Sequence, residues 1–312
     1  HNLYCEYTNR NDMSTESLIK SPIAENLSQM QIALHLPCAR CGYELRELMA
    51  DGDCPECGEP IRLTIIEVID PASKRLTPIH KPKAVGDSIA CVVLFFFVAV
   101  VLYVTAIVSK APESLPVPDF LRNISTMVLI CLSIAFGLLA ILAIVPMMKM
   151  SKRLELVSCR RGIILTFVGL LFWSISMALI AFVLLNQQTH SKAIMMLFDT
   201  CLPAIAGGIV FSGFRRMVPR LGQRSRAFRQ AQGSRQRMND LLAALVVLIV
   251  GRTLMAVSPT DSNTALLALI VMIMSLSLVV IGLGYLLHNI IWIRNALVTP
   301  PPAIPDLLRS KS

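Results

Sequence analysis

The sequence predicts a mainly α protein, in which a six-helix transmembrane bundle is preceded by a small β module. Three observations lead to this fold class. Of the 312 residues, 54% are hydrophobic, and the mean hydropathy of +0.64 is too high for an ordinary soluble protein. Six long apolar stretches occupy the chain after residue 87. Ahead of them, a polar segment carries four cysteines in two matched C-x-x-C-G motifs.

The apolar stretches are close to, or longer than, the roughly 20 residues with which a helix crosses a bilayer. We therefore expect a transmembrane domain over 88–298. Its six spans are predicted at about 88–108, 124–148, 163–185, 194–214, 241–257 and 265–293.

The remaining segments differ in composition. Residues 1–35 are polar and lack an apolar period, which predicts a disordered or weakly ordered arm. The cysteine-bearing module is expected at 36–69, and the β-branched residues of 61–68 predict a strand within it. Residues 70–87 combine prolines with basic residues and indicate a stiff basic linker. A Pro-rich, extended tail is expected at 299–312.

Positive charge is concentrated in the connections on one side of the predicted spans. Residues 1–87 hold 9 Lys and Arg against 13 Asp and Glu, whereas the rest of the chain holds 20 against 7. The linker, the second-to-third connection and the fourth-to-fifth connection carry most of this excess. Because Lys and Arg are retained in the cytoplasm, the pattern predicts that both termini are cytoplasmic.

The two cysteine motifs predict a metal site. Cys38 and Cys41 bring two sulfurs onto one turn, and Cys54 and Cys57 do the same on a second turn. The glycine that follows each pair permits a left-handed backbone, which turns amide groups toward sulfur. Four thiolates complete a tetrahedral shell, which suits structural Zn²⁺ first and mononuclear iron second. A filled shell leaves no open position for catalysis.

The motifs Cys38-Ala39-Arg40-Cys41-Gly42-Tyr43-Glu44-Leu45-Arg46 and Cys54-Pro55-Glu56-Cys57-Gly58 also resemble two known groups. The closer resemblance is to planctomycete-type bacterial multi-pass membrane proteins of unknown function, which begin with a zinc ribbon of pattern C-x-x-C-G-Y-x-L-R followed by C-P-x-C-G. This resemblance implies a zinc ribbon on a bacterial inner-membrane protein, and it implies no activity. The motifs are similar to rubredoxin as well, but only 12 residues separate Cys41 from Cys54, far fewer than rubredoxin uses.

Two charged residues are expected inside the membrane. Asp199 lies in the fourth predicted span and Arg252 in the fifth, each about five residues from the same face of the membrane. A lone charge is costly there, so we predict that the two side chains form an ion pair. Such a pair serves either to lock the bundle or to act in transport of a substrate or proton.

The connection from Arg215 to Arg237 contains eight arginines and no acidic residue. It is expected to lie on the inner leaflet and to bind anionic lipid. Aromatic residues for stacking on bases are scarce, which argues against nucleic acid. No residue set typical of an enzyme is evident. The sequence thus favours a binding or scaffolding module with an unidentified protein partner; the alternatives are a transporter or channel and a membrane-anchored, rubredoxin-like iron electron carrier.

Overall fold

The computed structural model describes residues 30–68, 79, 81–109, 118–150, 159–186, 192–231, 237–257, 263–299 and 307–310. The chain forms two compact units, one made of His1–Leu76 with Pro301–Ser312 and one made of Thr77–Pro300. The fold is mainly α, as predicted.

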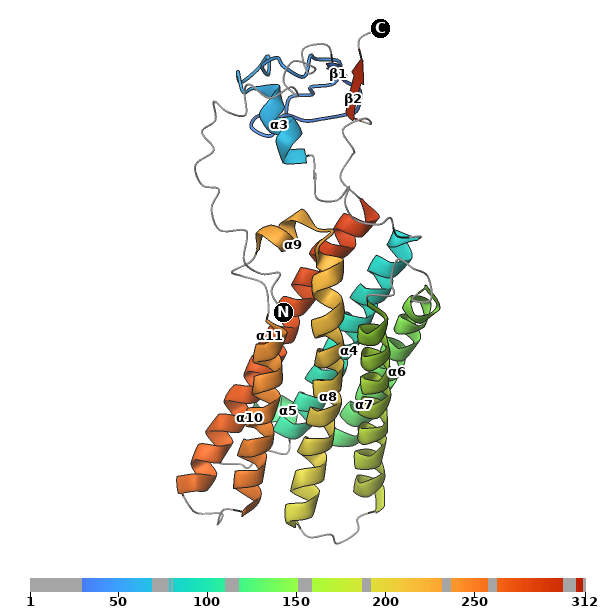
Figure 1. Cartoon of the computed structure of the whole chain (residues 1–312). Coiled ribbons are helices and arrows are strands. Elements are labelled where there is room, and N and C mark those ends of the chain that lie inside the picture. Colours follow the sequence, from blue (N-terminus) through green and yellow to red (C-terminus); the bar gives the residue numbers. More distant parts are fainter. Residues whose placement is uncertain are drawn as a thin grey trace, which may run out of the picture. The chain divides into compact units, whose positions relative to one another are not determined.

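The described part of Thr77–Pro300 contains six helices that are long and apolar enough to cross a membrane, as expected of a multi-pass membrane protein (Figure 1). Their bounds are α4 Pro82–Val108, α6 Thr126–Met150, α7 Arg160–Asn186, α8 Lys192–Gly222, α10 Met238–Val257 and α11 Asn263–Val298. Two short helices, α5 Asp119–Arg122 and α9 Arg226–Gln230, lie in the connections.

The six long helices pack in a closed ring. Along the chain α4 contacts α6, α6 contacts α7, α7 contacts α8, α8 contacts α10 and α10 contacts α11, and α11 returns to α4. Aromatic side chains fill the interior, where the ring of Phe96 lies edge-to-face against Trp173, Phe211 and Phe214. Large apolar side chains such as Phe182, 63% exposed, remain on the surface, as lipid contact requires.

Glycine sets the closest approach between α7 and α8. A Cβ built on Gly213 would stand 2.7 Å from the backbone nitrogen of Thr166, and one on Gly162 would stand 2.9 Å from the carbonyl oxygen of Gly213. No side chain fits at either position, so the two backbones meet directly. This contact brings Gly162, at the start of α7, against Arg216 of α8.

The other unit contains the cysteine module, which comprises residues 30–68 together with 307–310. It begins earlier than the expected position 36, because β1 (Met30–Ile32) is part of it. Backbone hydrogen bonds join β1 to the segment 47–50: Ile32 donates to Leu48 at 3.0 Å, and Ala50 donates to Met30 at 2.9 Å. The rest of the predicted arm, 1–29, lies outside the described residues.

The strand predicted at 61–68 is wrong, because these residues form the helix α3 (Ile61–Val68). Ile61, Thr64 and Ile65 fall on one face at helical spacing and are at most 5% exposed. A strand would have pointed alternate residues away from the module. The need to bury this stripe therefore outweighs the β preference of its isoleucines and threonine.

A strand near residue 310 belongs to the same module. β2 (Leu308–Ser310) pairs antiparallel with β1, with Gln31 opposite Arg309. Ala33 N–H donates to the carbonyl of Leu307 at 2.8 Å, and the Leu307 side chain is 1% exposed in the core of the module. Residues 308–310 of the predicted tail are therefore a paired strand, and its prolines at 300–305 lie outside the described residues.

The predicted basic linker also differs from the structure at its end. Helix α4 begins at Pro82, so residues 82–87 belong to the first long helix. Proline is favoured in the first turn of a helix because it needs no hydrogen-bond acceptor there. The part at 69–78 lies outside the described residues.

Candidate metal centre and an ion pair between two long helices

The two cysteine motifs fold in the same way, 16 residues apart along the chain. In the first, Gly42 N–H donates to the Cys38 carbonyl at 2.9 Å; in the second, Gly58 N–H donates to the Cys54 carbonyl at the same distance. A single bridge closes each turn, Pro37 with Glu44 and Asp53 with Pro60.

Both glycines have the left-handed backbone that the sequence predicts. The φ angle is 78° at Gly42 and 69° at Gly58. A side chain in this region is strained because its Cβ approaches the following carbonyl oxygen. Glycine avoids this strain at both turns.

The four sulfurs converge as the sequence predicts for a metal site. The Sγ atoms of Cys38, Cys41, Cys54 and Cys57 all lie within 4.8 Å of one another. Cys38 and Cys57 are 3.7 Å apart at sulfur, and Cys41 and Cys54 are 3.6 Å apart. A disulfide would need about 2.0 Å. A tetrahedron with metal–sulfur bonds of about 2.3 Å has sulfur–sulfur edges of about 3.8 Å. The spacing therefore fits one metal ion bound by four thiolates.

The thiols of the cluster differ in how readily they ionise. Backbone hydrogen bonds from Cys41 and Arg40 lower the pKa of the Cys38 thiol to about 6. The backbone of Tyr43 lowers the pKa of Cys41, but burial and the neighbouring thiols outweigh it and raise that pKa to about 12. The cluster thus stabilises one thiolate and resists further negative charge. A divalent ion at its centre would let the remaining thiols ionise.

Contacts outside the cluster fix the two turns. Arg40 Nη1 lies 3.1 Å from Glu59 Oε2, which links the first turn to the second. Ala39 N–H donates to the Thr64 hydroxyl at 3.2 Å, which ties the first turn to α3. Cys38 and Cys54 also belong to a core of buried apolar residues, whose other members are Ile32, Leu36, Leu45, Ala50, Ile61, Ile65 and Leu307.

The other cysteines do not join this cluster. Three of them lie in separate long helices: Cys91 in α4, Cys131 in α6 and Cys201 in α8. Cys159 directly precedes α7, and Cys5 lies outside the described residues. The motif spacing, rather than the cysteine count, is thus what identifies the ligands.

Asp199 of α8 and Arg252 of α10 lie in contact. Arg252 Nη2 is 3.0 Å from each carboxylate oxygen of Asp199. The arginine side chain is 12% exposed and the aspartate side chain 43%. Two neighbours hold the aspartate: the Thr200 hydroxyl donates to Oδ1 at 2.9 Å, and the Tyr103 hydroxyl of α4 donates to the Asp199 carbonyl. The contact thus joins three helices of the ring.

A second ion pair was not predicted. Arg294 Nε of α11 donates to Asp87 Oδ1 of α4 at 2.6 Å. The two helices are in close contact here, since a Cβ built on Gly86 would stand 3.4 Å from Arg294 Cα. The sequence places Asp87 in the predicted linker, outside the first span, and therefore predicts no partner for it. The two pairs lie at opposite ends of the bundle, because Asp87 is near the start of α4 and Asp199 is near the start of α8, which runs the other way.

The arginine-rich connection is partly helical. Helix α8 continues to Gly222, eight residues beyond the predicted span, and α9 follows. The apolar side chains Met217, Leu221 and Phe228 are at most 5% exposed, because they join the core of the bundle and not a lipid surface. Arg215, Arg216 and Arg220 are exposed.

Comparison with known proteins gives no relative. No protein-family model, curated protein or solved structure matches the chain. The resemblance to planctomycete-type membrane proteins therefore stays a prediction, supported only by the four clustered cysteines and the six apolar helices.

Proposed function

We propose that the chain is a multi-pass protein of a bacterial cytoplasmic membrane that carries a cytoplasmic, structural zinc ribbon and acts as a binding or scaffolding module. The convergence of four sulfurs at tetrahedral spacing is the observation that carries this proposal. Four cysteines fill the shell, so the ion would hold the module together without an open position for a substrate.

The pairing of β1 with β2 supports termini on one side of the membrane. β1 precedes the first long helix and β2 follows the last. Two strands that form one ladder must lie on the same side of a bilayer, as an even number of spans requires. Retention of basic connections in the cytoplasm selects that side.

Zinc is the proposed ion because thiolate ligands at this spacing suit it and because a module this small needs metal for stability. Metal analysis of the purified full chain should give about one zinc per chain and a colourless protein. Cys54→Ser should abolish binding, whereas Cys131→Ser, an exposed cysteine of α6 far along the chain from the motifs, should retain it. A red protein containing iron would instead favour the alternative of a rubredoxin-like electron carrier.

For the scaffolding role, the proposed partners are an unidentified cytoplasmic protein and anionic lipid at the Arg215–Arg237 connection. Exposed arginines near an anionic surface contribute on the order of 1 kcal/mol each. If the role is correct, Cys54→Ser should lose the protein partner in cross-linking within cells while the six spans still insert. If Cys54→Ser retains every cross-link of the parent protein, the scaffolding role is contradicted, even where the parent protein binds zinc.

The transporter or channel alternative is favoured by one observation, the contact of Asp199 with Arg252 between two long helices. Exchange of the two residues distinguishes the cases. A pair that only locks the bundle should tolerate the exchange, whereas a pair that acts in transport should keep the fold and lose flux. This alternative needs no zinc, so its outcome is independent of the metal analysis.

A further inference from the structure

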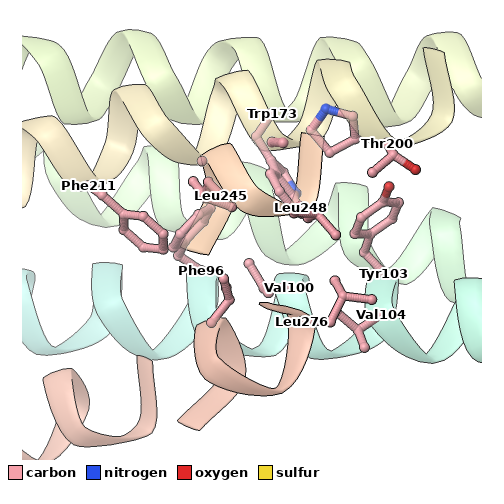
Figure 2. Close-up of a pocket in the computed structure, with 14 residues that line it drawn as sticks. Phe96, Val100, Tyr103, Val104, Trp173, Thr200, Phe211, Leu245, Leu248 and Leu276 are labelled. Atoms are coloured by element: carbon pink, nitrogen blue, oxygen red, sulfur yellow. The ribbon is translucent and has the colours of Figure 1, made fainter. Parts of the chain in front are cut away.

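Among the described residues of the bundle, the interior of the ring leaves no room for a large ligand. Figure 2 shows aromatic and aliphatic side chains of several helices facing one another there, among them Phe96, Trp173 and Leu248. The space between them has a volume of about 30 Å³, which is about the share of one molecule in liquid water. A ligand larger than water therefore has to bind on the outer surface of these helices.

Arginines gather on this outer surface where α7 begins and α8 ends. Gly162 of α7 packs so closely against α8 that a Cβ built on it would stand 3.3 Å from Arg216 Cβ. Arg161 directly precedes Gly162, and Arg220 follows Arg216 by about one turn of α8. All three arginines, here called the seam arginines, are exposed. They lie near one another at the same end of the bundle.

The charge of the seam arginines is not balanced by the protein. Among the described residues, none of the three pairs with an acidic side chain. Arg160 adds a further exposed charge beside Arg161, and the first turn of α7 contains no acidic residue. The positive end of the helix dipole lies at this turn and repels cations. The arrangement therefore does not stabilise α7, but it does attract an anion.

Apolar side chains continue the same side of both helices toward the middle of the spans. Val168 and Phe172 follow Arg161 by 7 and 11 residues, which at 3.6 residues per turn places them within about 20° of it around α7. They are 45% and 37% exposed. On α8, Ile205 lies 11 residues before Arg216 and is 49% exposed. The surface of the two helices thus has a cationic end and an apolar body.

We propose that this surface of α7 and α8 binds one anionic glycerophospholipid. The seam arginines contact its phosphate, because the guanidinium fork matches two phosphate oxygens, and an acyl chain lies along Val168, Phe172 and Ile205. A free phosphate matches the cationic end only, whereas a lipid matches both parts. The inference rests on the anionic-lipid partner proposed above, and it adds Arg161, which lies outside the Arg215–Arg237 connection.

Thermal unfolding of the delipidated full chain in detergent, followed by the fluorescence of its two tryptophans, measures this binding, because a ligand of the folded state raises the midpoint. Phosphatidylglycerol should raise the midpoint to a plateau, whereas phosphatidylcholine at equal concentration should not. Arg161→Gln should weaken phosphatidylglycerol binding about fivefold, which corresponds to about 1 kcal/mol for one arginine. The double change Arg161→Gln with Arg216→Gln should weaken it about 30-fold.

Lys83→Gln is the matched control, because it removes one exposed charge at the start of α4, the same end of the bundle. It should bind phosphatidylglycerol as the parent does, and a loss equal to that of Arg161→Gln would overturn the site. Each variant is compared with its own midpoint in the absence of lipid, so a change in basal stability does not imitate a change in binding.

The remaining outcomes separate this inference from the lipid partner on which it rests. If the parent prefers phosphatidylglycerol and Arg161→Gln binds it equally well, the seam site is wrong while binding by the connection stands. If the parent shows no preference for phosphatidylglycerol, both proposals fall. Glycerol 1-phosphate carries the charge without acyl chains. A midpoint rise equal to that given by the lipid at the same concentration would indicate a phosphate site and overturn the lipid.

Discussion

Leu307→Ala should loosen the cysteine module although the residue is more than 200 positions from any of the four sulfur ligands. Leu307 is 1% exposed and packs in the same core as Ile32 and Ile61. Truncation of a buried leucine costs about 2–5 kcal/mol, and a core this small can relax partly, so we expect about 2–3 kcal/mol. Since 1.4 kcal/mol is a factor of ten, the open population of the module should rise about 30- to 150-fold.

Metal transfer from the zinc-loaded full chain to excess chelator measures this opening, because a filled four-sulfur site releases its ion when the module opens. Leu307→Ala should release zinc faster by the factor above. Leu34→Ala is the matched control, since Leu34 lies in the same module and is 42% exposed. If both variants release zinc at the parental rate, Leu307 and the adjoining strand β2 do not stabilise the cysteine module.

Two further predictions concern the ion pair and the turns. Asp199→Asn should lower the free energy of unfolding of the detergent-solubilised protein by about 1–2 kcal/mol, which is less than the cost for a fully buried pair because the aspartate is partly exposed. The double variant that exchanges Asp199 and Arg252 should recover most of the lost melting temperature. If the exchanged protein is as unstable as Asp199→Asn, a direct interaction of the two side chains is contradicted. Gly42→Ala should weaken zinc retention by about 1–2 kcal/mol because φ at Gly42 is positive. Gly284→Ala, at a helical position with open space around a built Cβ, should leave zinc retention unchanged. Equal effects of the two changes would show that the left-handed turn does not determine zinc retention.

Features with a short sequence spacing could be predicted well. The turns around Gly42 and Gly58 depend on residues within a few positions of each other, and their geometry follows from the motif. The apolar stretches likewise predict six long helices, because a span needs only continuous hydrophobicity.

Features that depend on distant contacts could not be predicted in the same way. The isoleucines of α3 are favourable in a strand or a helix, and only the core that they face decides between them. The pairing of β2 with β1 rests on three residues in each strand, too few for a periodic pattern. The pairing of Asp87 with Arg294 could not be predicted because it requires α4 to begin at Pro82, six residues before the predicted span.

The position of Leu307 has a consequence for the order of biosynthesis. The ribosome makes the cysteines before any of the six long helices and Leu307 after all of them. At about 5–20 residues per second, the roughly 250 residues between the last cysteine and Leu307 take on the order of 10–50 seconds to translate. During that time the nascent module lacks part of its hydrophobic interior. Stable retention of a bound ion would therefore depend on a residue that is translated after all six long helices.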